Sequence, residues 1–263
     1  MHCSDHQLLA LNRAGFIPGP GESEEQFLER AQARLGDAVP SEWVSLHLQE
    51  LFDFRPDSLP VFYSNVSLTP WQGAAVWIEG RRVAKVQLRE NLKTGSYLGL
   101  YNRDEIWAHE AVHAARCAFE ESAYEEFFAY MTSQKKWRRV LGPIVRRPWE
   151  VWPMLVSALL GAWVPEFYWV TTLWMGAGFF RLIRQHRQLH RAALALGRGP
   201  KEARAILLRL TDEEIRHLAR TKIGSKEPKN RSNFFYRTPS KPLKPQGDLR
   251  RRLLHLAYGF SVE

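Results

Sequence analysis

One stretch of the sequence predicts both a helix and a site, Ile106-Trp107-Ala108-His109-Glu110-Ala111-Val112-His113. Residues four apart in an α-helix differ by about 40° in direction and lie about one turn apart, so His109 and His113 are expected to reach one metal ion. Glu110 projects beside the same face, where it can polarise a metal-bound water without being a ligand. A His-Glu-x-x-His motif on a helix is typical of zinc-dependent hydrolases.

A zinc site of this kind needs a third protein ligand and an open position for water. The segment that follows has the form of a capping box, with Ser122 as the N-cap and Glu125 reaching back to the backbone. This arrangement leaves Glu126 free in the first turn, and the small Ala129 one turn later allows close helix packing. We therefore expect Glu126 to be the third ligand. The alternatives are Glu125, Glu120 and Glu121.

At these residues the sequence resembles the gluzincin metallopeptidases, in which His-Glu-x-x-His is followed by a glutamate on a second helix. Residues 125–129, Glu-Glu-Phe-Phe-Ala, are similar to the Asn-Glu-Gly-Phe-Ala form of the second motif. The resemblance implies Zn²⁺ on His109, His113 and Glu126, Glu110 as general base, and a peptide or protein substrate. The resemblance covers residues 106–130. It departs from the family in two ways: the interval from His113 to Glu126 is shorter than in the large aminopeptidases, and Glu125 replaces the first Asn of the second motif.

The motif does not identify the group that stabilises the oxyanion formed during hydrolysis. The sequence offers Tyr130, Tyr236 and His217 as hydrogen-bond donors. Cys117 falls four residues after His113, on the ligand side of the helix. It is either a spare soft ligand or, as is more common for cysteine, a buried structural residue.

Composition and charge indicate the cellular compartment of this site and the kind of surface that the chain contacts. The chain has 263 residues and two cysteines, Cys3 and Cys117, which predict no disulfide framework and a reducing compartment. The N-terminus has no basic start followed by an apolar run, so we expect no signal peptide. Residues 1–134 hold 11 Lys or Arg against 19 Asp or Glu, whereas residues 135–263 hold 26 against 9. This asymmetry predicts that the second half contacts an acidic surface.

The region before the motif is expected to contain helices and then a small sheet. Residues 7–60 are predicted to be helical, with a capping box at Ser23 and an N-cap at Ser41. The predicted strands are Val61–Tyr63, Ala74–Glu79, Val83–Leu88 and Tyr97–Tyr101, with a hairpin turn at Glu79-Gly80-Arg81-Arg82. The prediction is an α+β, zincin-like domain over residues 1–140. An edge strand of its mainly antiparallel sheet aligns an extended peptide beside the metal.

Residues 141–185 are predicted to form a membrane hairpin. Trp149–Val164 is apolar apart from Glu150, Phe167–Ile183 has no charge until Arg181, and Pro165-Glu166 separates them. Each run is somewhat short against the roughly 20 apolar residues of a spanning helix. One long kinked spanning helix and a buried soluble hairpin are the alternatives.

The flanks favour the hairpin, because basic residues on both sides predict that both ends lie in the cytoplasm. These residues are Lys135, Lys136, Arg138, Arg139, Arg146, Arg147, Arg181, Arg184, Arg187 and Arg191. The expected location is therefore a membrane, with the metal site and both termini on the cytoplasmic side. Residues 186–263 are predicted to be a basic region of helices and loops beside anionic lipid. Membrane proximity explains this charge more simply than nucleic-acid binding does.

Two further interpretations use the same histidines. The first is a di-iron site, in one of two forms. A membrane oxygenase of the His-box type is suggested by the second pair His186 and His190, but it needs about eight histidines. A carboxylate-bridged di-iron bundle is suggested by Glu214-x-x-His217, which repeats the spacing of Glu110 and His113, but it needs two more inward glutamates. A non-catalytic membrane adaptor with a structural zinc site is the other interpretation.

Overall fold

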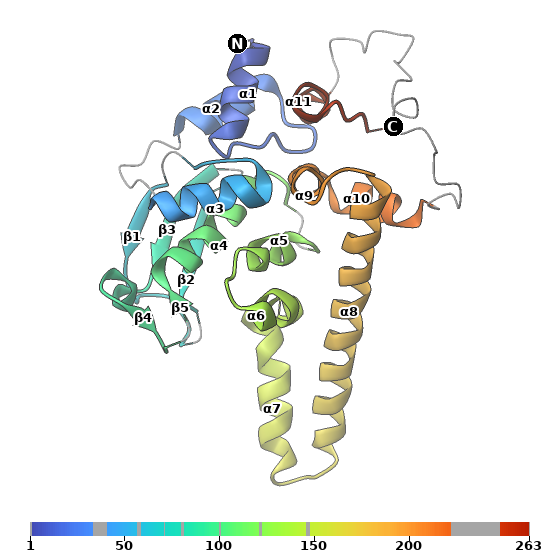
Figure 1. The fold of residues 1–263 in the computed structure, drawn as a ribbon. Coiled ribbons are helices and arrows are strands. Elements are labelled where there is room, and N and C mark those ends of the chain that lie inside the picture. Colours follow the sequence, from blue (N-terminus) through green and yellow to red (C-terminus); the bar gives the residue numbers. More distant parts are fainter. Residues whose placement is uncertain are drawn as a thin grey trace.

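The computed structural model describes residues 2–33, 41–56, 59–70, 72–79, 82–99, 101–120, 123–145, 148–221 and 248–262. These residues form helices and a small sheet that lies at one edge of the molecule, which confirms the α+β class (Figure 1). The described core contains one large cluster of buried side chains that runs from Ile17 to Leu254. A smaller cluster joins the first two helices to the last one.

Three helices precede the sheet: α1 (Asp5–Arg13), α2 (Glu24–Ala33) and α3 (Glu42–Phe52). The capping box predicted at Ser23 is confirmed, because Ser23 and Gln26 exchange side-chain-to-backbone hydrogen bonds of 3.1 and 3.2 Å. Ser41 caps α3 through a bond to the Val44 amide. These caps satisfy amides that a helix start leaves without partners, so local sequence sets where α2 and α3 begin.

Three of the four predicted strands are present in the described residues, but one pairing was not anticipated. The antiparallel pair β2 (Ala74–Glu79) and β3 (Arg82–Leu88) has Glu79 opposite Arg82, as the predicted hairpin requires. β1 (Val61–Tyr63) pairs with β3 in parallel, so this sheet is mixed, in the order β1-β3-β2. The segment predicted as a fourth strand instead forms a small antiparallel pair of β4 (Ser96–Tyr97) and β5 (Tyr101–Asn102).

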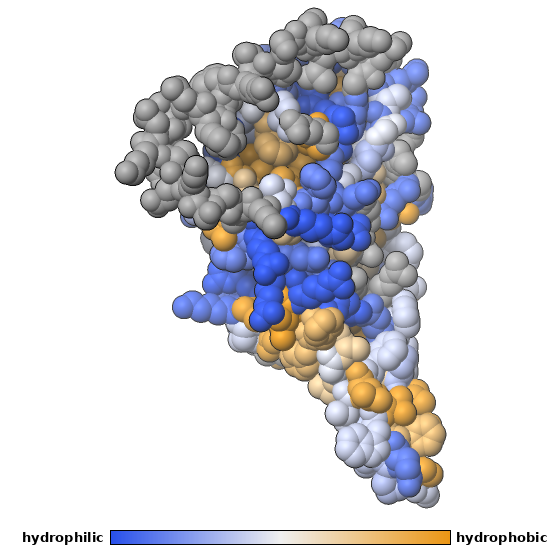
Figure 2. Space-filling view, turned by 90° about the vertical axis from the view of Figure 1, so that its right-hand side faces the viewer, coloured by the Kyte–Doolittle hydropathy of each residue, from blue (hydrophilic) through white to orange (hydrophobic). Residues whose placement is uncertain are grey.

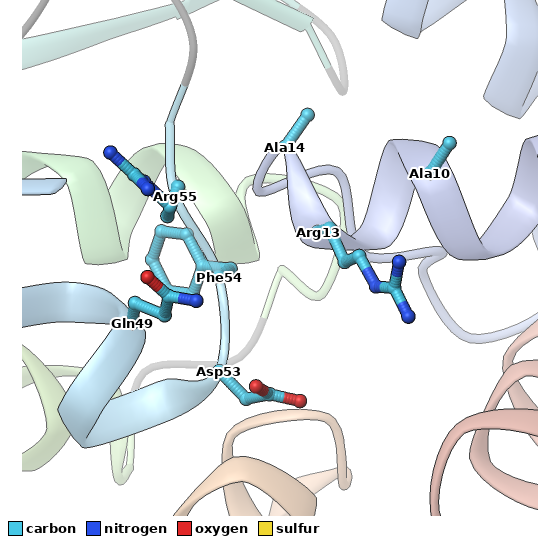
Figure 3. A pocket seen from close by; sticks show the side chains of 7 residues that line it. All are labelled: Ala10, Arg13, Ala14, Gln49, Asp53, Phe54 and Arg55. Atoms are coloured by element: carbon cyan, nitrogen blue, oxygen red, sulfur yellow. The ribbon is translucent and has the colours of Figure 1, made fainter. Parts of the chain in front are cut away.

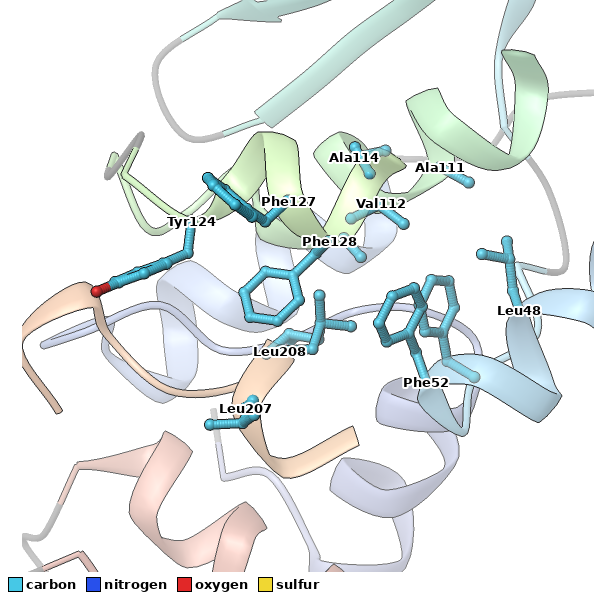
Figure 4. Packing of buried hydrophobic residues seen from close by; sticks show 14 of the residues in the cluster. Leu48, Phe52, Ala111, Val112, Ala114, Tyr124, Phe127, Phe128, Leu207 and Leu208 are labelled. Carbon is cyan, nitrogen blue, oxygen red and sulfur yellow. The ribbon is translucent and has the colours of Figure 1, made fainter. Parts of the chain in front are cut away.

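The motif helix α4 (Arg103–Arg116) and the following α5 (Glu125–Met131) occupy the middle of the molecule. Small residues of α4 pack against α3 and α9, and Phe128 of α5 lies edge-on to Phe52 of α3 at 6.2 Å between ring centroids (Figure 4). This apolar side fixes both helices to the core. Their opposite sides carry the polar residues of the site.

The region predicted as a hairpin forms one. After the short α6 (Lys136–Leu141), α7 (Val151–Gly161) and α8 (Phe167–Ala195) run side by side and project from the rest of the molecule (Figure 1). The chain turns between Ala162 and Glu166, where the turn at Pro165-Glu166 was predicted. Among the described helices, none is both long enough and apolar enough to cross a membrane.

The second half of α8, from Arg181 onward, is rich in arginine and belongs to the same unbroken helix as the apolar first half. It is followed by α9 (Pro200–Leu208), α10 (Asp212–Arg220) and α11 (Leu249–Tyr258). Thr211 and Glu214 form a capping box at the start of α10. Tyr236 lies within residues 222–247, which are outside the described residues.

Candidate metal centre

Helix α4 presents the two histidines of the motif to a cleft. Asn102 caps its start by accepting a hydrogen bond from the Asp104 amide. Ala111 and Val112 are fully buried in the core, whereas His109 and His113 keep about a sixth of their side-chain surface exposed. The helical period therefore separates a packing side from a site side, as the motif predicts.

The three predicted ligands are brought together. The Nε2 atoms of His109 and His113 are 3.2 Å apart, and each lies 3.6 Å from a carboxylate oxygen of Glu126. Ligands of a tetrahedral zinc ion, with Zn–N bonds of about 2.0–2.1 Å, are separated from one another by roughly 3.3 Å. The two distances to Glu126 run to different oxygens, Oε2 from His109 and Oε1 from His113, and the three side chains lie close enough together to share one zinc ion.

A second hydrogen bond orients His113. Its Nδ1 atom lies 2.7 Å from the Glu125 carboxylate. Such outer partners fix the ring and leave the other nitrogen for a metal. Sequence reasoning placed Glu125 in a helix cap. The structure instead begins α5 at Glu125, with Tyr124 at the N-cap and no side-chain capping bond, while Ser122 lies outside the described residues.

The charges of the cluster are strongly coupled. Burial alone lowers the pKa of His113, but the carboxylates of Glu126 and Glu125 outweigh burial and raise that pKa to about 10. Burial, and then the positive His113, hold the pKa of His109 well below its usual range. Without a metal, one imidazolium therefore balances the carboxylates around it. A divalent cation that displaces this proton matches the donor set.

Glu110 lies in the same cleft but outside the ligand group. It is 7% exposed. Burial raises the pKa of Glu110, and the negative charges of Glu126 and Glu125 raise it further. The positive charge of His113 lowers this pKa, and the resulting value is about 7. Burial also raises the pKa of Glu126, against the charge of His113. Burial disfavours the charge of Glu125 as well, but its hydrogen bond to His113 outweighs this and lowers its pKa.

Tyr130, predicted as an oxyanion donor, lies against the cluster. Its ring meets that of His109 edge-on, with centroids 4.7 Å apart. Burial, followed by the charge of Glu126, raises the pKa of its phenol, which keeps the hydroxyl protonated as a hydrogen-bond donor. Gly142 allows this packing, because a Cβ at that position would stand 2.3 Å from the Tyr130 ring.

The cluster forms the floor of a cleft of about 640 Å³. Consecutive residues from Gln72 to Val76, at the start of β2, line one side. Side chains alternate between the two faces of a strand, so a consecutive run indicates that β2 presents its backbone edge. β2 is an edge strand of the sheet. The far wall contains Val145, Val151 and Leu155 from the start of the hairpin.

Several residues considered from the sequence lie elsewhere. Cys117 is buried with its sulfur 3.8 Å from a nitrogen of Arg30, outside the ligand group. His217 is exposed on α10, and His186 contacts the Val140 carbonyl at 2.9 Å. Glu214 is bound by Arg250 at 2.7 Å. Within the described part of the chain, His109, His113 and Glu126 form the one group arranged to hold a metal.

Two buried arginines have places that the sequence did not predict: Arg116 was not considered, and Arg138 was counted among the basic residues that flank the hairpin but is 5% exposed. Arg116, at the end of α4, is 1% exposed, donates to the carbonyls of Leu208 and Leu210, and lies over the Phe119 ring. Arg138 binds Glu105 at 2.9 Å and lies over the Tyr101 ring. An arginine inside a core carries no sequence signal of its own, because its partners come from distant segments.

A second, smaller hollow of about 200 Å³ lies between α1 and α3 (Figure 3). Arg13, Asp53 and Arg55 are its charged residues, and Asp53 accepts a hydrogen bond from Tyr258. It contains no histidine or cysteine, so it offers no comparable metal chemistry.

No known protein family, curated protein or solved structure matches this chain.

Proposed function

We propose that this chain is a zinc-dependent metallopeptidase of gluzincin type that works at a membrane. The observation that carries the proposal is the ligand group: His109, His113 and Glu126 bring their ligand atoms within 4.8 Å of one another, in a cleft bordered by the edge strand β2. An edge strand can hydrogen-bond an extended peptide along its backbone. That pairing lays a peptide bond across the cluster.

The reaction divides among three groups of residues. Zinc held by His109, His113 and Glu126 would act as a Lewis acid and would lower the pKa of a water bound to it. Glu110 would accept a proton from the attacking water as the water oxygen bonds to the scissile carbonyl carbon, and would deliver that proton to the amine when the C–N bond breaks. The hydroxyl of Tyr130 donates a hydrogen bond to the carbonyl oxygen as its negative charge develops. The products are a carboxylic acid and an amine.

Zinc content and peptide hydrolysis, measured together, test this assignment. The detergent-purified chain is expected to hold about one zinc and to cleave members of a soluble peptide library read by mass spectrometry. Glu110→Gln should keep the zinc and lose hydrolysis by at least about a thousandfold, a general-base effect. His113→Ala and Glu126→Ala should lose both.

The other outcomes separate the rival functions. Zinc without hydrolysis of any library peptide would indicate a structural site in an adaptor. Two irons per chain would indicate an oxygenase. Hydrolysis that survives His113→Ala would remove the metal from the mechanism.

The membrane part of the proposal rests on the apolar surface of the hairpin. Trp152, Leu159, Trp163, Trp169 and Leu173 are each more than half exposed. Exposed positions cover the outward sides of the two helices and the turn between them, and exposed apolar surface of this extent marks an interaction site. One acidic residue, Glu166, lies at the turn and would cost about 2.5–3.5 kcal/mol at a bilayer centre. Two large apolar side chains leaving water offset that cost, at about 1.5–3 kcal/mol each.

The cations next to the hairpin match an anionic bilayer. Exposed lysines and arginines on α6 and on the second half of α8 surround the base of the hairpin, namely Lys136, Arg139, Arg184, Arg187 and Arg191. Figure 2 shows this as blue surface directly beyond the orange and pale hairpin. Each cation near such a surface contributes about 1 kcal/mol.

Vesicle flotation tests the attachment. The chain should float with vesicles that contain phosphatidylglycerol and bind less to pure phosphatidylcholine. The double substitution Trp163→Glu with Trp169→Glu should abolish flotation. Val66→Glu is the matched control, since Val66 is 74% exposed but lies outside the hairpin. Flotation that persists in the double variant would contradict the attachment. It would also be contradicted if the chain formed an oligomer through the hairpin and did not bind vesicles.

A further inference from the structure

We infer that the hairpin enters a single leaflet and that the cleft cleaves the juxtamembrane segment of a membrane-anchored polypeptide. This inference rests on the proposed function and specifies its substrate class. It is carried by the structural continuity between the far wall of the cleft, at Val151 and Leu155, and the exposed hairpin.

The distribution of exposed side chains favours lipid over a protein partner. All residues from Ala162 to Val170 are exposed, and so are those from Thr172 to Ala177. A partner helix or groove would cover one stripe of α8, whereas a leaflet surrounds the hairpin. A helix that is apolar all round is typical of a membrane environment. The hairpin therefore has the surface expected of an element immersed in acyl chains.

Polar groups inside the hairpin are satisfied locally. The hydroxyls of Ser157 and Thr171 lie 2.8 Å apart, between α7 and α8, and Thr172 donates to the Tyr168 carbonyl at 2.8 Å. Near the turn, Gly161 lets the Tyr168 ring approach, because a Cβ there would meet it at 2.8 Å. Small residues and internal hydroxyl bonds are how helices pack where no water is present.

The length of the hairpin matches one leaflet. The 11 residues of α7 rise about 16 Å at 1.5 Å per residue. The hydrocarbon core of a bilayer is about 30 Å thick, so this length reaches roughly its middle. At the base, Arg181 binds the Glu150 carboxylate at 2.9 Å and the Ile144 carbonyl at 2.8 Å. This ion pair marks the level at which the apolar part of the hairpin ends.

The same level contains the mouth of the metal cleft. Val151 is the first residue of α7 and Leu155 lies about one turn further toward the tip, and both line the cleft. With the hairpin in the leaflet, this wall stands at the headgroups. A chain that leaves the bilayer beside α7 passes directly into the space between the wall and β2. A segment a few residues outside a membrane anchor is therefore the substrate that this placement favours.

A substrate series with different spacers tests the inference. The soluble peptide that the chain cleaves best is inserted into a single-span host polypeptide in phosphatidylglycerol-containing vesicles. The spacer between the span and the cleavage site has about 5 or about 40 residues. Effective concentration falls roughly as the −3/2 power of linker length, so the short-spacer substrate should be cleaved about twentyfold faster.

Hairpin variants provide the control. Trp163 and Trp169 do not line the cleft, so Trp163→Glu with Trp169→Glu should cleave the soluble peptide at the wild-type rate and lose the preference for the short spacer. Val66→Glu should keep both. Equal rates with the two spacers, or a preference that survives the double variant, would overturn the inference and leave the peptidase assignment intact. Failure to cleave any soluble peptide would instead reject the proposed function.

Discussion

The metal cleft and the hairpin depart in opposite ways from the usual distribution of residues. The cleft holds His109, Glu110, His113 and Glu126 in or near the core, where charge is costly. The hairpin exposes tryptophans and leucines where water is the default neighbour. A component from outside the chain would make each region favourable, a cation for the cleft and an apolar medium for the hairpin. The acidic donor set of the cleft thus favours a cation, and the apolar surface of the hairpin favours lipid.

The largest expected effect is the loss of folding stability when the metal is removed. With zinc at about a thousand times its dissociation constant, binding stabilises the fold by about 4 kcal/mol. Chelation should then lower the melting temperature by roughly 10 °C for a chain of this size. Thermal unfolding with and without EDTA measures this shift.

The chelation experiment has an internal control. The melting temperature of His113→Ala should not respond to EDTA, and vesicle flotation of the wild type should be unchanged by it, because the hairpin does not depend on the metal. A wild-type melting temperature that ignores chelation would show that the cluster is stable without a cation.

The next effect concerns the hydroxyl of Tyr130. Tyr130→Phe keeps the ring that packs on His109 and removes the hydroxyl that we propose donates to the developing oxyanion. Loss of one such donor costs about a hundredfold to a thousandfold in kcat. Steady-state kinetics should show this fall with KM and zinc content little changed. Tyr101→Phe, another tyrosine of the same cleft, is the control and should retain activity. An unaltered kcat in Tyr130→Phe would exclude the assigned role.

Much of this site could be predicted from the sequence, because its ligand residues lie close together in the chain. The four-residue spacing of His109 and His113 sets their geometry within one helix, and Glu126 follows within the next. The turn between β2 and β3 was predicted for the same reason, since the residues that pair are neighbours in the chain. Capping boxes at Ser23 and Thr211 likewise involve residues three apart.

What the sequence did not predict depends on contacts between distant segments. The side-chain period of β1 is the same whether it pairs in parallel or antiparallel, so its parallel pairing with β3 carries no local signal. Glu125 matches a cap pattern but contacts His113, 12 residues away. Val151 and Leu155 reach the cleft only because the hairpin begins beside it. Their place in the site is a consequence of tertiary packing.

A smaller effect is expected at Glu125, which orients a ligand without binding the metal. Glu125→Gln keeps the side-chain shape and removes the charge that faces His113 at 2.7 Å. Loss of such an outer partner typically weakens metal binding by about tenfold to a hundredfold. Competition with a chromophoric chelator measures this affinity. Glu213→Gln, an exposed change on α10, should leave it unaltered. Equal affinities for the two variants would show that Glu125 does not support the site.

The smallest expected change is in the folding stability of a hairpin variant. Trp163 is 87% exposed, so Trp163→Ala in detergent should alter the free energy of unfolding by no more than about 0.5 kcal/mol. Phe128→Ala, at a residue with no exposed surface, should cost about 3–5 kcal/mol. Denaturant unfolding compares the two. If Trp163→Ala destabilises the chain as Phe128→Ala does, the tryptophan packs inside the protein and the hairpin surface is not free for lipid. A neutral result, combined with weaker flotation, separates membrane binding from folding.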